Sequence, residues 1–596
     1  MRATTLPFIC VLILLAAGAG RLVYLEHYEG PALAERARAQ QTARLAIPAL
    51  RGDILDTKGR LLAGGLRYPS VYADPALLKD PRDRHYAACS IAPVLGMPAG
   101  ELEAMLQERV DDRFIWIRRG ISEEEAAAFT AVRDARRLYA FGTQYEQERT
   151  HPYGTLAAHV LGFVGDPVAG VARGLAGSEL QYDQALGGSE GYRVSTVDAQ
   201  RRRLRTRVEE YVPPQDGASI VLTIDVHVQQ QTELHLRNAV ETFKARWGAA
   251  VVMDPQSGEI LAMATMPDYD PAAPIPPGLS GAALERAQET LQNRAIAHAY
   301  EPGSVFKPFI AAMALEDGVT RLDEVFQING PTRQFGRRTI HDTHAYSSLP
   351  LHEVISRSSN IGMSILGGRC GNDRLYRYVR SYGFGDLTGI TLPGEHTGLV
   401  QDFSRWSGYS SQSIPIGQEI AVTGVQIAAA FSVFANGGVL YRPRIVRGVV
   451  DAEGNTILDC SRPVALRRLL SRETADRFRE EALVETCMSS IGTGKNAQIE
   501  GYRTFGKTGT AQVAIPGERG YRSGQYVGSF VGGAPADNPR VVCLVSIYRP
   551  SSGKYYGGTV AAPAVGSILA DTLAYMQVPP EVTSPNTGRI MPGGAP

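Results

Sequence analysis

Three short motifs that combine serine, lysine, asparagine and threonine stand in one order along the sequence. Residues 304–307 read S-V-F-K, residues 358–360 read S-S-N and residues 507–510 read K-T-G-T. The order S-x-x-K, S-x-N, K-T-G is that of an active-site serine acyl-transfer centre. The chain has only seven lysines, and two of them fall where such a centre needs an amine. The ordered set therefore predicts serine-based acyl transfer, although each motif alone is weak.

The first motif lies where a helix is expected to begin. Ser304 follows a Pro-Gly pair, and apolar residues then repeat at helical spacing, which places Lys307 one turn further on the same face. A serine hydroxyl is a weak nucleophile until a neighbouring base takes its proton, and a lysine can do so if burial lowers its pKa. We therefore expect Ser304 to be the nucleophile and Lys307 the base. A second S-x-x-K, residues 551–554, lies in a Pro-Ser-Ser-Gly turn and is read as a chance match.

The second motif supplies two polar side chains in a predicted turn between helices. Ser358 offers a hydroxyl, and Asn360 offers both a hydrogen-bond donor and an acceptor, which suits the binding of a peptide bond. Another S-x-N, residues 584–586, lies in the polar tail. The motif therefore carries weight only together with the other two.

The third motif is predicted on an edge-like strand. Gly509 removes side-chain bulk there, so a substrate strand can approach and pair with the backbone. Lys507 and the hydroxyls of Thr508 and Thr510 could hold a terminal carboxylate.

No pattern predicts a metal or a cofactor. Residues 341–344 read H-D-T-H, but two histidines at this spacing are common on exposed loops. The spacing of the six cysteines matches no zinc or redox motif. We expect neither a metal site nor a cofactor.

The overall charge argues against nucleic acid as a partner. Lys plus Arg and Asp plus Glu both total 61, so the chain has no global field of one sign. The arginine-rich run at residues 201–207 lacks interleaved aromatic residues and is read as a solvated face.

The N-terminus carries the one membrane signal in the sequence. Residues 6–20 are uncharged and mostly apolar, residues 22–25 extend them, and Arg2 precedes them. This pattern predicts a membrane anchor at 5–25, with residues 1–4 in the cytoplasm and the body outside. A cleaved signal peptide is the alternative, because residues 17–19 read A-G-A.

The whole chain has 596 residues, which is too long for one core. After the anchor it divides into two patterned regions. The pattern of residues 26–215 predicts a spacer. It contains a charged helix at 28–41, a hairpin at 51–63 and helical periodicity over 83–140. A Pro-Pro-Gln-Asp-Gly segment at 213–217 marks a boundary. In the second region, 216–578, we expect strands at 218–225, 505–512, 526–532 and 541–548 and a hairpin at 249–262. We expect helices at 226–243, 420–435 and 561–576. The fold class is mixed α/β (α+β), and residues 579–596 have the composition of a disordered tail.

These motifs resemble those of class B penicillin-binding proteins, the D,D-transpeptidases of bacterial peptidoglycan synthesis. The resemblance covers nearly the whole chain, from R-G-D-I-L-D at 51–56 to Y-E-P-G-S at 300–304 and G-K-T-G-T-A at 506–511. It is greatest to the FtsI, or cell-division, branch, because the elongation branch usually has aspartate where Asn360 stands. The elongation branch shares Gln512, so an elongation-type enzyme is an alternative. The resemblance implies a membrane anchor, a non-catalytic dimerisation-type pedestal and a penicillin-binding transpeptidase domain whose central antiparallel sheet is covered by helices.

The resemblance also implies a role for each motif residue. Ser304 would attack the penultimate D-Ala carbonyl of a stem peptide, with Lys307 as general base and Ser358 passing a proton to the leaving amine. Asn360 would hold the donor peptide. The groups that orient Ser358 and the substrate carboxylate would be Lys507, Thr508 and Thr510.

The implied partners are D-Ala-D-Ala stem peptides, β-lactams, divisome proteins and a polytopic glycosyltransferase of the FtsW/RodA type. The implied location is the cytoplasmic membrane, crossed once, with a periplasmic catalytic domain active in septal wall synthesis. Two other enzyme classes share the motifs, serine β-lactamases and D,D-carboxypeptidases. A further alternative is a scaffold that activates the glycosyltransferase.

Overall fold

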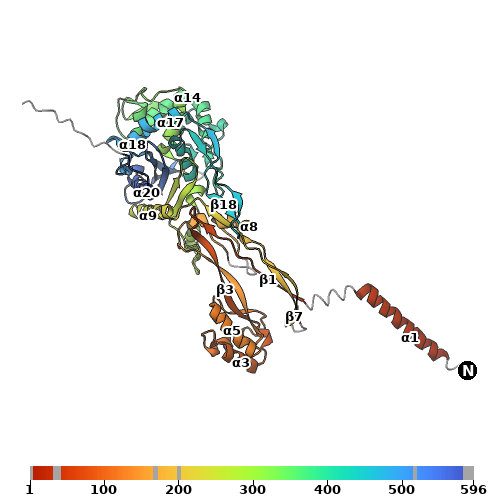
Figure 1. Ribbon diagram of the computed structural model, residues 1–596. Coiled ribbons are helices and arrows are strands. Elements are labelled where there is room, and N and C mark those ends of the chain that lie inside the picture. The colour runs from red at the N-terminus through yellow and green to blue at the C-terminus, as the bar shows by residue number, and fades with distance from the viewer. Residues whose placement is uncertain (1–4, 31–41, 166–171, 198–202, 515–519, 582–596) are drawn as a thin grey trace, which may run out of the picture.

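The computed structural model describes residues 5–30, 42–165, 172–197, 203–514 and 520–581. These residues form an N-terminal helix, an elongated pedestal and a larger domain built around a sheet (Figure 1). Most of the predicted helix 28–41 and of the predicted tail 579–596 lies outside the described residues.

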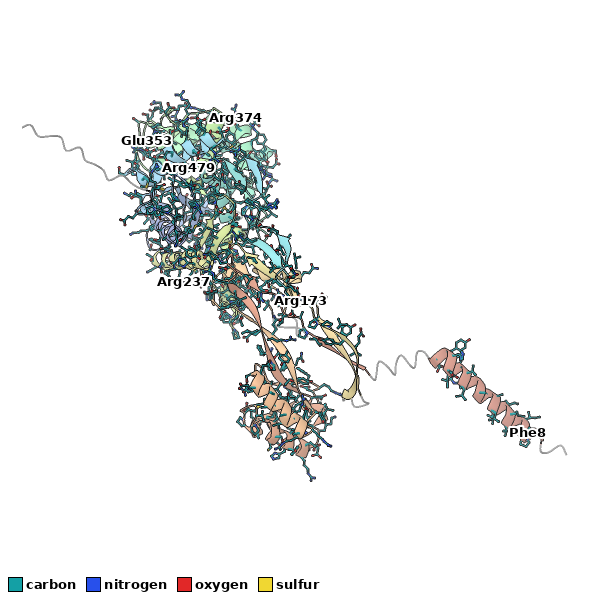
Figure 2. All side chains as sticks on the ribbon, viewed as in Figure 1. Phe8, Arg173, Arg237, Glu353, Arg374 and Arg479 are labelled. Carbon is teal, nitrogen blue, oxygen red and sulfur yellow. The ribbon has the colours of Figure 1, made fainter. Side chains whose placement is uncertain are left out.

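The N-terminal helix has the length and composition of a membrane span. α1 (Thr5–Tyr24) continues into a short π-helical turn, η1 (Leu25–Glu29). At 1.5 Å per residue, its 20 residues reach about 30 Å, the thickness of the hydrocarbon core of a bilayer. Apolar side chains such as Phe8, which is 68% exposed, point outward from it (Figure 2). By length and composition alone, residues Pro7–Glu29 can therefore cross a membrane.

The pedestal combines antiparallel strands with a small helical head. Its strands are β1 (Thr42–Ile47), β2 (Ile54–Leu55), β3 (Leu61–Ala73), β4 (Ile115–Arg118), β5 (Phe141–Thr150), β6 (Gly191–Val197) and β7 (Arg203–Val212). Its helices are α3 (Pro81–Ile91), α4 (Ala99–Glu108), α5 (Glu123–Ala135), α6 (Ala158–Leu161), α7 (Gly177–Gln181) and α8 (Asp183–Gly187). The predicted hairpin 51–63 is confirmed, because β2 pairs with β3 across a turn at Gly59, whose φ of 78° favours glycine.

The head only partly follows its predicted helical periodicity. Helix α5 lies within the predicted region and begins after Ser122, which forms a reciprocal capping box with Glu125. The prediction is wrong for β4, whose residues alternate between buried and half-buried positions as a strand requires. Its pairing with the long strand β3 fixes it in the sheet.

One sheet runs from the pedestal into the larger domain. β2 pairs in parallel with β8 (Ser219–Leu222), which pairs with β18 (Val446–Val450), and β19 (Thr456–Asp459) forms the far edge. A buried cluster lies on the pedestal side of this junction: Glu179 accepts hydrogen bonds from Arg51 Nε at 2.7 Å and Arg149 Nε at 2.6 Å. The segment 213–217, in which Gln215 forms an isolated bridge with Ser189, therefore connects regions that share a sheet.

The larger domain is organised by a five-stranded antiparallel sheet in the order β10-β9-β23-β22-β21. Its strands are β9 (Trp247–Met253), β10 (Ile260–Met266), β21 (Phe505–Ala514), β22 (Tyr521–Ala534) and β23 (Val541–Tyr548). The strand predictions in these regions are confirmed. β21, which carries the third motif, is an edge strand of this sheet.

Helices cover both faces of the sheet. On one face, Ala250 and Val252 pack with α9 (Val226–Thr242) and α20 (Ala562–Tyr575); on the other, Val251 and Met253 join the core formed by α12 (Lys307–Glu316) and α16 (Gly424–Ser432). This alternation is the period of two expected of a strand buried on both sides. The mixed fold class and the helix-covered sheet predicted from the sequence are confirmed (Figure 1).

The remaining elements complete the domain. Its other helices are α10 (Gly281–Thr290), α11 (Arg294–Ala297), α13 (Leu351–Ser356), α14 (Asn360–Ser381), α15 (Ser410–Ser413), α17 (Arg472–Phe478), α18 (Glu485–Met488) and α19 (Gly557–Val560). Its short strands are β11 (Val325–Gln327), β12 (Thr332–Phe335), β13 (Arg338–His341), β14 (Ser348–Pro350), β15 (Leu399–Val400), β16 (Ile420–Ala421), β17 (Val439–Tyr441) and β20 (Ala465–Arg468).

The predicted helix 420–435 begins later than expected. Its first residues form β16, and α16 starts after Thr423, whose side chain caps it together with Gln426. This reciprocal cap fixes the helix start and leaves the preceding apolar residues to pair as a strand.

Candidate active site

Ser304 lies in a tight turn that leads into a buried helix. The structure places it in a 3₁₀ turn, η3 (Gly303–Phe306), and the α-helix α12 begins only at Lys307. Residues three apart eclipse one another in a 3₁₀ turn, so Ser304 and Lys307 share one side. Ser304 is half-buried, whereas Lys307 is fully buried. The arrangement leaves the hydroxyl accessible and withdraws the amine from water.

The turn that carries Ser304 is held from behind by a second backbone segment. Gly303 N donates to Gly417 O at 3.1 Å. A Cβ on Gly417 would come within 2.1 Å of the Gly303 carbonyl oxygen. Only glycine at position 417 permits this approach, which fixes the position of the nucleophile's turn.

The Lys307 amine points into the second motif. Its Nζ donates to Ser358 O at 2.6 Å, to Asn360 Oδ1 at 2.8 Å and to Ser358 Oγ at 3.2 Å. Burial lowers the pKa of Lys307 to about 7, against a smaller opposing effect of the Asp342 carboxylate. Near neutral pH a large fraction of this amine is therefore unprotonated and able to accept a proton.

The second motif is the turn between α13 and α14, as predicted. Ser358 adopts a left-handed conformation with φ of 61°, which is costly for a residue with a side chain. Asp342 holds the segment that follows: its carboxylate accepts from Ser359 Oγ at 2.5 Å, from Asn360 N at 2.5 Å and from Ile361 N at 3.0 Å. A carboxylate at the N-terminus of α14 is also favoured by the helix dipole.

The third motif approaches from the edge strand β21. Lys507 is fully buried, and its Nζ donates to Ser358 Oγ at 3.0 Å and to Thr508 O at 3.2 Å. Burial, together with the positive charge of Lys307, lowers the pKa of Lys507 well below its usual value. The Ser358 hydroxyl thus lies between two amines that come from different elements.

Gly509 lets the strand and the nucleophile's turn pack together. A Cβ at this position would come 2.6 Å from Val305 Cγ2 and 2.6 Å from Ser529 Oγ. The glycine therefore admits the η3 turn itself, whereas the sequence argument invoked a substrate strand. Thr510 is half-buried, and its Oγ1 accepts from Gly557 N at 3.1 Å, so the hydroxyl hydrogen remains able to donate.

The three motifs thus come together: the Lys307 and Lys507 amines, both with lowered pKa, meet at the Ser358 hydroxyl, and Ser304 lies in the turn that leads into Lys307. A family model for the penicillin binding protein transpeptidase domain matches residues 248–570, and one for the penicillin-binding protein dimerisation domain matches residues 46–222. The chain belongs to the class B penicillin-binding proteins.

Individual relatives of this penicillin-binding protein extend over nearly the whole chain. "Stage V sporulation protein D" of Bacillus subtilis is 33% identical over 570 residues, covering 94% of this chain and 83% of that protein. "Peptidoglycan D,D-transpeptidase FtsI" of Escherichia coli is 30% identical over 593 residues, covering 96% of this chain and 91% of that protein. Among solved structures, penicillin binding protein 3 of Mycobacterium tuberculosis, complexed with aztreonam, has a TM-score of 0.67 at 28% identity. The match covers 90% of this chain and 98% of that chain.

The chance match at 551–554 lies outside this cluster. Ser551 donates its hydroxyl to Lys244 O at 2.9 Å, and both Ser551 and Lys554 are exposed, on the loop after β23. The S-x-N at 584–586 lies outside the described residues. The surrounding structure, rather than the residue types, distinguishes the S-x-x-K at 304–307 from the one at 551–554.

Two neighbours of the site were not recognised in the sequence of this penicillin-binding protein. Asp342 was considered only as a metal ligand, and the part of the chain that the structure describes holds no cluster of three metal-ligating side chains. Thr493 Oγ1 lies 2.8 Å from Thr508 Oγ1, and Thr493 N donates to Ser356 O at 3.3 Å, so it joins the third motif to the end of α13. The one sequence signal for Thr493 is the glycine on each side of it, which indicates close backbone packing.

Proposed function

We propose that this protein is a membrane-anchored D,D-transpeptidase that cross-links peptidoglycan stem peptides through a Ser304 acyl-enzyme, acts in septal wall synthesis and is inhibited covalently by β-lactams. The observation that carries the proposal is the shared Ser358 hydroxyl, which accepts from Lys307 at 3.2 Å and from Lys507 at 3.0 Å. A hydroxyl bonded to two buried amines is suited to move a proton rather than to stabilise a core.

In the acylation step, Ser304 Oγ attacks the penultimate D-Ala carbonyl carbon. Its proton passes to Lys307 Nζ, which burial keeps partly unprotonated near pH 7. General-base catalysis of this kind contributes roughly 10²–10⁴-fold. The backbone N–H groups of Ser304 and Thr510 would receive the oxyanion, and one such donor is worth about 3–4 kcal/mol.

Collapse of the tetrahedral intermediate expels the terminal D-Ala. The leaving amine takes its proton through Ser358, which Lys307 resupplies. Asn360 keeps one side-chain N–H for the donor peptide. Its Oδ1 accepts from Lys307, and among the described residues its amide nitrogen donates to His341 O alone, at 2.8 Å.

The carboxylate of the donor peptide would meet the hydroxyls of the third motif. Thr510 retains a hydroxyl hydrogen to donate, and Thr508 is held in place by Thr493. Lys507 is turned inward to Ser358, so it acts on the carboxylate through its charge and through these hydroxyls. An amine from a neighbouring strand then attacks the acyl-enzyme, and the new amide bond is the cross-link.

The N-terminal helix and the pedestal support the cellular part of the proposal. α1 would anchor the chain in the cytoplasmic membrane by a single crossing, and the positive residue before it would keep that end in the cytoplasm. The pedestal would then hold the active site away from the membrane, where FtsW/RodA-type glycosyltransferases and divisome proteins could contact it. FtsI-named relatives over the full length favour the septal role.

Labelling with a fluorescent penicillin tests the proposal. We expect the full-length chain to form a stable adduct, Ser304→Ala to lose it and the matched control Ser551→Ala to retain it. Loss of the adduct in Ser551→Ala alone would show that the nucleophile is misassigned. Rapid release of the hydrolysed drug would instead identify a β-lactamase.

A further inference from the structure

We propose that the larger domain carries a second ligand site, a pocket for a sugar phosphate, behind the catalytic helices. A cavity of about 330 Å³ lies there. Its lining residues are Met313, Asp317, Tyr376, Arg377, Tyr378, Arg380, Ser381 and Arg467. The volume is within the roughly 300–1,000 Å³ typical of small-molecule pockets.

The pocket is separate from the Ser304 centre. Lys307 begins α12 and Asn360 begins α14, whereas the cavity is lined by the C-terminal ends of the same two helices. Ten residues of α12 correspond to about 15 Å between the two sites. Gly371, whose φ of 71° breaks the helical path of α14, lies between its two ends. No motif residue takes part in the pocket, so the inference does not rest on the proposed function.

The charge of the lining favours a dianion. Arg380 is already engaged, donating to Phe384 O at 3.0 Å and to Asp386 Oδ1 at 2.7 Å. Arg377 of α14 and Arg467 of β20, by contrast, make no hydrogen bond or ion pair with any residue that the structure describes. Two exposed guanidinium groups from different elements therefore lie at one cavity without an ion-pair partner among the described residues. A phosphate monoester carries about −1.5 to −2 at neutral pH and accepts paired hydrogen bonds from arginine.

A tyrosine ring in the cavity lining, packed against two further aromatic rings outside it, favours a sugar ring beside the phosphate. Tyr376 lines the pocket, and its ring lies 5.4 Å from Phe403 and 5.5 Å from Trp406, centroid to centroid. Phe403 remains 40% exposed. The C–H face of a pyranose ring is apolar and packs on such rings, and free phosphate gains nothing from them.

A carboxylate supplies the remaining polar contact. Asp317 accepts the Tyr378 hydroxyl at 2.6 Å through Oδ2, and its other oxygen accepts no hydrogen bond from the described residues. That oxygen can accept hydrogen bonds from sugar hydroxyls, and its negative charge repels an anion that has no hydroxyl to donate. Guanidinium groups, aromatic rings and an acceptor in one cavity together select a phosphorylated sugar over inorganic phosphate.

Calorimetric titration of the full-length chain in detergent tests the site, with N-acetylglucosamine 1-phosphate as the probe. We expect it to bind about tenfold or more tightly than either N-acetylglucosamine or inorganic phosphate. The double variant Arg377→Gln/Arg467→Gln should weaken binding by about tenfold or more. Tyr376→Leu should reduce the advantage of the sugar phosphate over inorganic phosphate.

The matched control is Arg374→Gln. Arg374 lies on the same helix, is exposed and does not line the cavity (Figure 2). Its loss should change binding by less than about twofold. Equal weakening by Arg374→Gln would indicate diffuse surface charge and overturn the proposal, as would absent binding or a double variant that binds like wild type. Circular dichroism checks folding, and the single Arg377→Gln variant replaces the double variant if that fails to fold.

Discussion

The side-chain amines of Lys307 and Lys507 meet at a single hydroxyl, since both donate to Ser358 Oγ within 3.2 Å. Both amines are fully buried, and the pKa of each is lowered. Two ammonium groups this close in a dry site would repel one another strongly. Removal of one proton relieves that repulsion, so the fold itself favours an unprotonated amine next to the turn that carries Ser304.

The pH dependence of acylation should follow the titration of Lys307. Its pKa is lowered to about 7, and only the unprotonated amine can take the Ser304 proton. The rate of penicillin acylation should therefore rise between about pH 6 and 8 and then level off. Stopped-flow measurement with a fluorescent penicillin checks this. Lys307→Arg, which stays protonated, should acylate roughly 10²–10⁴-fold more slowly. A flat profile over this range would contradict the role given to Lys307.

Removal of the Asp342 carboxylate should move that profile to lower pH. Its charge raises the pKa of Lys307 in opposition to burial, so Asp342→Asn should lower it further. The Asn360 turn would also lose acceptors, and the plateau rate should fall by roughly tenfold to a hundredfold, as misplacement of catalytic groups by about 1 Å does.

The control for this change is Asp323→Asn. Its side chain is 77% exposed and pairs with Arg321 at 3.1 Å, so neither the midpoint nor the plateau should move. If Asp342→Asn raises the midpoint instead, the electrostatic interpretation is wrong.

The sequence was sufficient for the features that depend on local patterns. The Ser304 turn, the break between α13 and α14 and the edge strand β21 each follow from a few neighbouring residues. The contacts of Asp342 and Thr493 could not be predicted, because their partners lie far along the chain and no periodicity links them. β4 was missed for a similar reason, since its pairing with β3 rather than its own four residues makes it a strand.

Gly509→Ala should disrupt the site by packing alone. The added methyl group would meet Val305 and Ser529 at 2.6 Å, which forces β21 away from the η3 turn. We expect a loss of stability of about 1–3 kcal/mol and a roughly hundredfold slower acylation. Gly100→Ala is the control, because nothing lies within 4 Å of its added methyl group on α4. Equal acylation by both variants would show that Gly509 has no such positioning role.

Glu179→Gln should weaken the junction between the pedestal and the larger domain. The carboxylate has no solvent exposure and pairs with both Arg51 and Arg149. Its loss leaves the buried Arg149 guanidinium without its ion-pair partner, whereas Arg51 keeps Asp183 at 2.7 Å. Breaking a buried pair in this way costs about 3–5 kcal/mol, which should appear as a lower melting temperature of the full-length chain.

The matched control for the junction is Glu289→Gln, which removes an exposed pair with Arg246 at 2.7 Å. Exposed pairs contribute about 0–1 kcal/mol, so its melting temperature should stay close to that of wild type. Because Glu179 is remote from the Ser304 cluster, penicillin labelling of the folded variant at low temperature should persist. A Glu179→Gln chain that melts like the control would mean that the ion cluster does not stabilise the pedestal beside the shared sheet.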